Sequence, residues 1–192
     1  MLIQQEAQVR LLSISRWVIQ CCIAAVVAGA AATGHAGTDP SGQVLVFDIV
    51  GGQRPRSADG PLLVLSATGQ ISVRPPRPGD ARITVQLSPA ESAALLDAVV
   101  TQYGAFDIDG AAIDDALSRA GDGRLRIADA STTSLTLTLD DRHHAVSVTA
   151  LPQQARRHPE IVPLQRFFRL AGYLQARAAA LTAHPHTSAA PD

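Results

Sequence analysis

The side chains best suited to binding chemistry in this sequence are arginines. All sixteen basic residues are Arg, and seventeen acidic residues bring the formal net charge to −1. Arginines gather in two polar stretches, at 53–60 and 74–82, and a guanidinium fork can bind carboxylate or phosphate with two parallel hydrogen bonds. The alternative is that these arginines only keep the surface solvated. The candidate partner-binding residues are Gln53, Arg54, Arg56, Arg74 and Arg77.

The acidic stretch 106–115 is the strongest candidate for a metal site. An EF-hand aligned on its glycine requires ligands at the first and twelfth positions, where this chain has Ala105 and Ala116. The stretch therefore indicates a solvated acidic loop in which Asp109 caps a short helix. We predict no metal site and no cofactor.

The histidines do not form a recognisable catalytic group. His143 and His144 are adjacent, so on a strand their side chains point to opposite faces and cannot hold one ion together. No serine stands in a Gly-x-Ser-x-Gly elbow. A hydrolase that pairs Asp129 with a nearby histidine is the weakest of the alternatives. We expect no catalytic residue and no enzymatic activity.

The composition excludes several classes of function. A net charge of −1 does not provide the basic face that nucleic-acid binding requires. The absence of lysine excludes a Schiff base, a P-loop lysine and a Ser–Lys dyad.

The first 36 residues have the pattern of a secretory signal peptide. Two arginines precede an apolar run over 17–32, and small residues follow it, with cleavage expected after Ala32 or after Ala36. The alternative is an uncleaved anchor in the inner membrane, although the sixteen-residue run, interrupted by Gln20, falls short of the roughly 20 apolar residues that a spanning helix needs. The pattern predicts a periplasmic or secreted protein without stable membrane insertion once the signal is cleaved.

The two cysteines, Cys21 and Cys22, both lie in the apolar run. Cleavage therefore leaves a chain without disulfides, which must rely on its hydrophobic core.

The elements that must position the arginines follow from periodicity. Apolar runs of period two predict strands, and a Ser-Pro-Ala-Glu box followed by an apolar stripe of helical period predicts a helix that ends at a glycine. Together they predict a single α+β domain over 44–182, with an antiparallel sheet of about five or six strands, two main helices packed on one face, and a disordered tail over 183–192. Strands are expected at 44–50, 61–66, 70–74, 83–87, 135–139 and 142–150, and the main helices at 88–104 and 163–182.

Five short motifs follow one another in a fixed order along residues 44–176. This order is similar to that of an uncharacterised family of exported bacterial proteins and lipoproteins, and the resemblance implies the fold and export but no activity. The motifs are Gly51-Gly52, Ser88-Pro89-Ala90-Glu91, Asp129-Ala130-Ser131-Thr132-Thr133, Ala150-Leu151 and Pro159-Glu160-Ile161.

The order of Gly-Gly loop, helix and late hairpin also resembles the emfourin-type inhibitors of thermolysin-like metalloproteases. This resemblance implies a small α+β inhibitor with a protease as its partner. The chain has Gln53-Arg54 after Gly51-Gly52, where we expect an aromatic and a small residue, so no inhibitory residue is carried over.

These observations favour an exported, non-enzymatic domain that binds another exported or envelope protein through its loops or a strand edge. The alternative is a module that binds an anionic small molecule or envelope polymer through the arginine-bearing loops.

Overall fold

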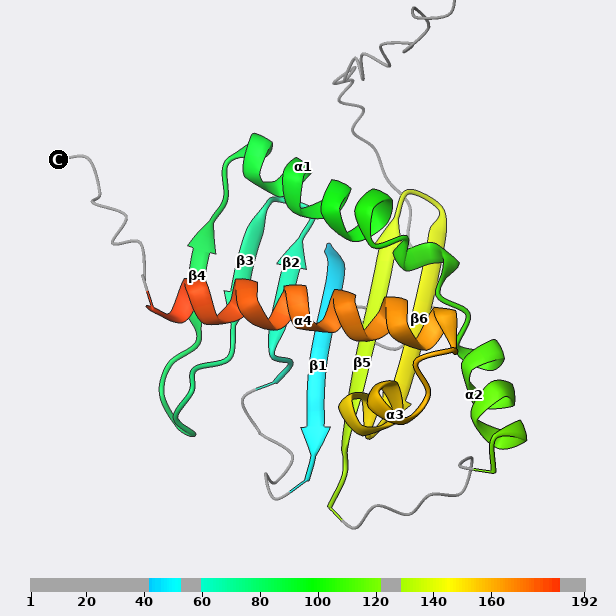
Figure 1. Ribbon diagram of the computed structural model, residues 1–192. Coiled ribbons are helices and arrows are strands. Elements are labelled where there is room, and N and C mark those ends of the chain that lie inside the picture. Colours follow the sequence, from blue (N-terminus) through cyan, green and yellow to red (C-terminus); the bar gives the residue numbers. More distant parts are fainter. Residues whose placement is uncertain (1–41, 53–59, 122–128, 184–192) are drawn as a thin grey trace, which may run out of the picture. The chain divides into compact units, whose positions relative to one another are not determined.

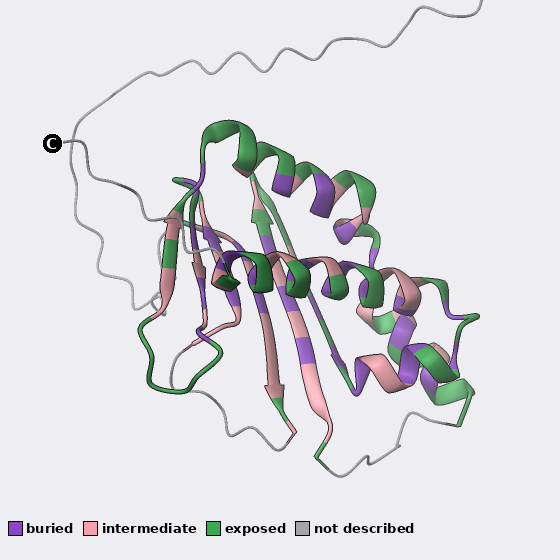
Figure 2. Cartoon of the chain, turned by 60° about the vertical axis from the view of Figure 1, so that its left-hand side comes forward, coloured by how far each residue is buried: buried purple, intermediate pink, exposed green. Residues whose placement is uncertain are grey.

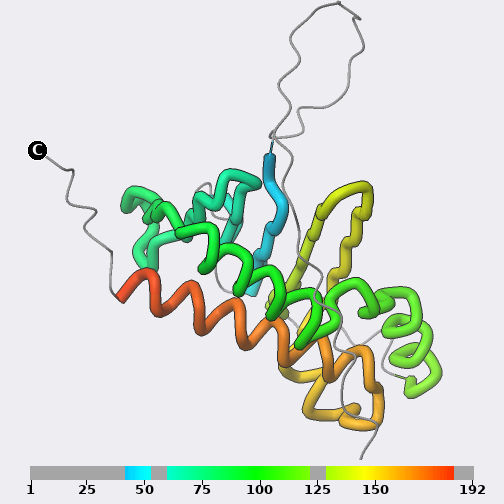
Figure 3. Tube along the Cα trace, turned by 90° about the horizontal axis from the view of Figure 1, so that it is seen from above, coloured from blue at the N-terminus to red at the C-terminus, as the bar shows by residue number. Residues whose placement is uncertain are grey.

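The computed structural model describes residues 42–52, 60–121 and 129–183. In these residues six strands form one antiparallel sheet in the order β4-β3-β2-β1-β5-β6, and the helices lie on one of its faces (Figures 1 and 3). The α+β class is therefore confirmed. The strands are β1 (Gln43–Gly51), β2 (Leu63–Ser66), β3 (Gln70–Val73), β4 (Ile83–Gln86), β5 (Ser131–Leu139) and β6 (Arg142–Thr149).

The predicted signal peptide, the candidate residues Gln53, Arg54 and Arg56, and residues 184–192 of the predicted tail lie outside the described residues.

β1 is the long strand at the centre of the sheet. It pairs with β2 along one side and with β5 along the other. Its side chains Leu45 and Phe47 are fully buried, whereas Val46 and Asp48, which alternate with them, are half-buried on the opposite face. Alternation of period two thus directs one set of side chains into the core, which lies between the sheet and the helices (Figure 2).

β5 places polar side chains on the face of the sheet that lies opposite the helices. Leu135 and Leu137 are buried, and Thr136 and Ser134 point the other way. This confirms the half-buried strand that the alternation of leucine and threonine predicts.

The helix after β4 begins where its capping box predicts. The Ser88 hydroxyl accepts from the Glu91 amide at 3.2 Å, and the Ser88 amide donates to the Glu91 carboxylate at 2.9 Å. α1 (Pro89–Asp97) then continues into the π-helical turn η1 (Ala98–Gln102). The 3₁₀ turn η2 (Ala105–Asp107) follows.

α2 (Gly110–Arg119) begins at a predicted cap. The Asp109 carboxylate accepts from the Ala112 amide at 3.0 Å, as expected for the N-cap position.

The final helix, α4 (Val162–Ala183), agrees with its prediction to within one residue at each end. The short helix α3 (Leu151–Arg157), which follows β6, is not among the predicted helices. Proline is acceptable in the first turn of a helix, where its missing N–H has no partner to lose. α4 crosses the sheet, and its buried face consists of Leu164, Phe167, Leu170, Ala171, Leu174, Ala178 and Leu181.

Candidate functional site

One end of the sheet gathers most of the features that the sequence singled out. β1 and β3 end there, and β2, β4 and β5 begin there, so we call it the loop end (Figure 1). Arg74 follows β3, and Arg77 lies in the connection from β3 to β4. Gln53, Arg54 and Arg56 belong to the segment between Gly52 and Gly60, outside the described residues.

Arg74 is engaged within the protein. Its Nη1 donates to Asp48 Oδ1 at 3.1 Å and to the Gly60 carbonyl at 2.9 Å, and its Nη2 donates to the Ile49 carbonyl at 3.2 Å. The Arg74 and Asp48 side chains are only 15% and 19% exposed. A shielded, charge-assisted contact of this kind is stronger than an ion pair on the open surface.

The Arg74 contacts join the two flanks of segment 53–59. Asp48 and Ile49 lie on β1 before the segment, and Gly60 lies immediately after it. Asp48 Oδ1 also accepts from the Leu62 amide at 3.1 Å. We call this set of contacts the Arg74 clamp, and it fixes where the segment leaves the sheet and where it returns.

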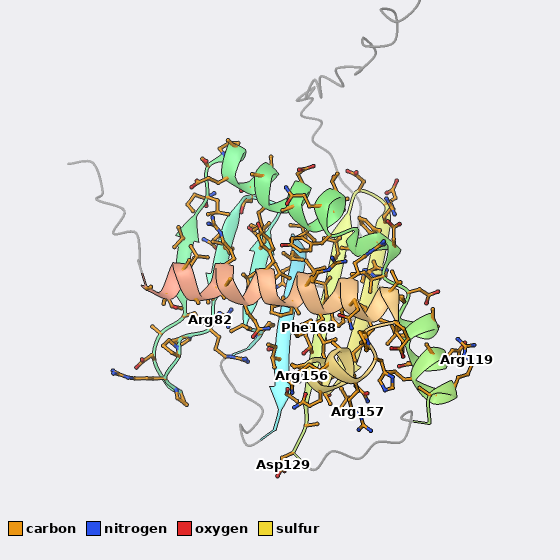
Figure 4. All side chains as sticks on the ribbon, in the orientation of Figure 1. Arg82, Arg119, Asp129, Arg156, Arg157 and Phe168 are labelled. Atoms are coloured by element: carbon orange, nitrogen blue, oxygen red, sulfur yellow. The ribbon has the colours of Figure 1, made fainter. Side chains whose placement is uncertain are left out.

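Arg82 fastens the returning flank a second time. Its Nη1 donates to the Pro61 carbonyl at 2.8 Å, and its Nε donates to the Ser72 hydroxyl at 2.9 Å. Figure 4 shows its side chain near the start of β4. Arg74 and Arg82 are thus part of the scaffold, although a count of basic residues would place both on a binding surface.

The Gly-Gly motif fastens the departing flank to β5. Gly51 and Gly52 have φ of +92° and +75°. A Cβ atom at Gly52 would lie 3.0 Å from the Asp129 carbonyl oxygen, and one at Gly51 would lie 3.3 Å from that of Ala130. Two motifs far apart in the sequence therefore meet by backbone contact, and the contact requires glycine.

Arg77 differs from Arg74. Its side chain is exposed, and its guanidinium group makes no hydrogen bond or ion pair with another of the described residues, although its carbonyl accepts from the Asp80 amide at 3.4 Å. Of the two candidate arginines that the structure describes, Arg77 faces solvent and Arg74 is turned inward.

The histidines have ordinary structural contacts. His143 Nδ1 lies 3.0 Å from the Thr138 hydroxyl, whereas His144 packs against Phe106 with ring centroids 6.0 Å apart. Their opposite orientation is as predicted from adjacency on a strand. His158 Nδ1 lies 3.2 Å from Glu160 Oε1. Among the described residues, no group of three His, Cys, Asp or Glu side chains is placed to hold a metal ion.

A second region was not found by sequence analysis. Residues 101–104, Asp107, Arg166 and Arg169 line a pocket of about 290 Å³ between the end of η1 and α4. Its two arginines belong to the polar side of α4, and their residue type and spacing alone indicate only a solvated helix surface. No sequence signal indicates that residues some sixty positions apart meet here.

Comparison with protein-family models, with curated proteins and with solved structures finds no match to this chain. Within the described parts of the chain, no helix combines the length and the apolar character needed to cross a membrane.

Proposed function

We propose that this chain is an exported, non-enzymatic domain that binds another exported or envelope protein through the segment between β1 and β2. The Arg74 clamp carries the proposal, because it fastens both flanks of that segment to the sheet. Binding residues are commonly presented on loops whose ends a rigid scaffold positions.

The clamp has a thermodynamic consequence for binding. Association has to offset the entropy lost when a loop is ordered at the interface. Flanks that are already fixed on the sheet lose little further freedom when a partner binds. Gln53, Arg54 and Arg56 lie within five residues of the clamped Ile49 or Gly60 in the sequence and would supply polar contacts to the partner.

The non-enzymatic character is supported by what the described polar groups do. Asp48 accepts from Arg74, Asp109 caps α2 and His143 contacts Thr138, so each has a structural partner. Asp129, which a hydrolase would need, enters β5 in a left-handed conformation with φ of +61° and lies at the tip of the loop end (Figure 4).

A protease is the partner that the resemblance to emfourin-type inhibitors favours. The Gly-Gly contact with the start of β5 gives that resemblance a structural rationale, because the two motifs shape the same end of the sheet. A periplasmic or secreted location, which the N-terminal 36 residues predict, would place the domain where exported proteases act.

Affinity capture from envelope extract of the source cells tests the proposal. The wild-type exported protein should retain one stoichiometric protein, identified by mass spectrometry. The double variant Arg54→Ala/Arg56→Ala should lose it, whereas Arg119→Ala, on α2 away from the loop end, should not (Figure 4). Equal capture by wild type and the double variant would overturn the assignment to this segment.

Inhibition is the second step of the same test. The wild-type protein should inhibit a thermolysin-type metalloprotease that is assayed with a fluorogenic peptide substrate. The double variant should not inhibit it. If the captured partner has no protease activity, the protein-binding proposal stands but the proposed inhibitor function is wrong.

Binding of an anionic small molecule or polymer at the loops has less support. Arg74 and Arg82 already donate to the protein itself, so their guanidinium groups cannot converge on such a ligand without breaking the clamp. This alternative rests on Arg54, Arg56 and Arg77. It predicts that Arg54→Ala with Arg77→Ala abolishes polymer binding at unchanged thermal stability.

A further inference from the structure

The pocket between η1 and α4 has two solvent-accessible arginines, Arg166 and Arg169, in its lining, and an aromatic contact holds one of its sides. Its volume of about 290 Å³ lies at the lower end of the range for ligand sites, and it suits a small molecule or the end of a larger one. The sheet and the loop end contribute none of its lining, so it is separate from the segment proposed to bind a protein partner.

The backbone around Gly104 makes room for charged groups. η1 is a π-helical turn, a local widening of the helix that occurs frequently at functional sites. Gly104 follows in the left-handed conformation with φ of +59°. A Cβ atom there would lie 3.2 Å from Asp107 Oδ2 and 3.3 Å from Arg166 Nη1, so the chain passes close to both charged groups, and the left-handed backbone favours glycine.

The arginines of the pocket keep their donors available. The distance from Arg166 Nη1 to Asp107 Oδ2 is 3.8 Å, which is too long for a hydrogen bond, and the side chains are 36% and 74% exposed. Arg169 is exposed, stands three residues further along α4, and therefore lies on the same side of the helix. Neither guanidinium group donates a hydrogen bond to another residue in the described ranges.

One wall of the pocket is stabilised by aromatic contact. The rings of Tyr103 and Tyr173 lie 5.0 Å apart at 31°, so Tyr103 is held against α4 beside the two arginines.

The charge of the lining selects the ligand. Two guanidinium groups outweigh one carboxylate, and guanidinium matches a planar or tetrahedral oxyanion with paired hydrogen bonds. We infer that this pocket binds a small molecule through an oxyanion group, a phosphate or a carboxylate, held by Arg166 and Arg169. Asp107 opposes the anion and limits its affinity.

Isothermal titration calorimetry at constant ionic strength tests the site. Inorganic phosphate and succinate serve as the two probes, and the tighter one identifies the oxyanion. For that probe, Arg166→Gln and Arg169→Gln should each weaken binding by about tenfold or more, since each removes a charge-assisted pair of hydrogen bonds. Arg169→Lys, which keeps the charge and loses the fork, should weaken binding less.

Asp107→Asn provides a test in the opposite direction. Removing its charge should tighten binding of the better probe by about fivefold. The matched control is Arg119→Gln, which removes an exposed arginine on α2 and should leave binding unchanged, as should Arg54→Ala/Arg56→Ala.

Three results would overturn the inference. The first is no heat from either probe with the folded wild-type protein. The second is equal weakening by Arg119→Gln and Arg169→Gln, which would indicate only general charge attraction. The third is weaker binding after Asp107→Asn. Unfolding curves without ligand confirm that each variant is folded, and loss of the protein partner in the loop variant leaves this test unaffected.

Discussion

The arginines at the loop end and those at the pocket differ in whether the protein itself accepts their hydrogen bonds. At the loop end, Arg74 and Arg82 donate at distances of 2.8 to 3.2 Å to carbonyl, hydroxyl and carboxylate oxygens of the protein. At the pocket, Arg166 has only a 3.8 Å approach to Asp107, and Arg169 is exposed. The first pair stabilises the fold, and the second pair retains donors for a ligand.

The difference lies in the neighbours of each arginine. Arg74 borders β3, and two strands away Asp48 faces the same side of the sheet, so carboxylate and carbonyl acceptors surround the guanidinium group. Arg166 and Arg169 stand on a helix surface where the nearest acid is itself largely exposed. Whether an arginine binds a partner is therefore decided by the acceptors already around it.

The largest expected effect comes from removing the Arg74 clamp. Arg74→Met should lower the free energy of unfolding by about 3 kcal/mol, because it leaves the shielded Asp48 carboxylate without its cation and removes one donor each from the Gly60 and Ile49 carbonyls. Urea denaturation followed by circular dichroism measures the loss. Arg77→Met, the exposed neighbour, should change the same quantity by less than about 0.5 kcal/mol, and equal losses would remove the distinction between them.

The Gly-Gly contact should have the next largest effect. Gly52→Ala should cost about 2 kcal/mol, because it adds a strained positive φ to a close approach against the Asp129 carbonyl. Gly79→Ala is the matched control, since Gly79 has φ of +85° but nothing within 4 Å of an added Cβ, and it should cost about 1 kcal/mol. Thermal denaturation of both variants separates the cost of the close approach to Asp129 from the cost of a positive φ, which both share. A larger loss of stability in Gly79→Ala than in Gly52→Ala would contradict the role of the close approach.

Arg82 should contribute less than Arg74. Arg82→Met should cost about 1.5 kcal/mol, since its acceptors at Ser72 and Pro61 are neutral oxygens. The same urea experiment ranks the two variants, and a loss larger than that of Arg74→Met would contradict the role given to Asp48.

The pocket arginines should have the smallest effect on stability. Arg169→Gln should change the free energy of unfolding by less than about 0.5 kcal/mol, as expected for an exposed side chain. A loss above about 1 kcal/mol in denaturant would show that Arg169 is part of the scaffold as Arg74 is.

Local signals in the sequence were sufficient for most of the fold. The alternation around Leu135 and Leu137 predicts β5, and the box of Ser88 and Glu91 predicts the start of α1, because both depend on near neighbours in the chain. α3 has no such signal, because its seven residues are too few to show an apolar stripe of helical period, and Pro152 in its first turn is as common in loops.

The candidate site was much less predictable. The partner of Arg74 is Asp48, 26 residues away, and only the pairing of β1, β2 and β3 shows that they meet. The pocket depends on contact between Asp107 and Arg166, which belong to separate elements. Hydrogen-bond partners of surface arginines are tertiary facts, so residue type and spacing could not distinguish Arg74 from Arg77.

Thermal denaturation of Arg74→Met and Arg169→Gln, each with and without inorganic phosphate, tests the contrast between the two regions most directly. Phosphate stabilises folded proteins in general, so the wild-type shift in Tm is the reference for both variants. We predict that Arg74→Met unfolds roughly 10 °C lower but keeps the full phosphate shift, whereas Arg169→Gln keeps the wild-type Tm without phosphate and loses the specific part of the shift. A full phosphate shift in Arg169→Gln, or an unchanged Tm in Arg74→Met, would contradict the account.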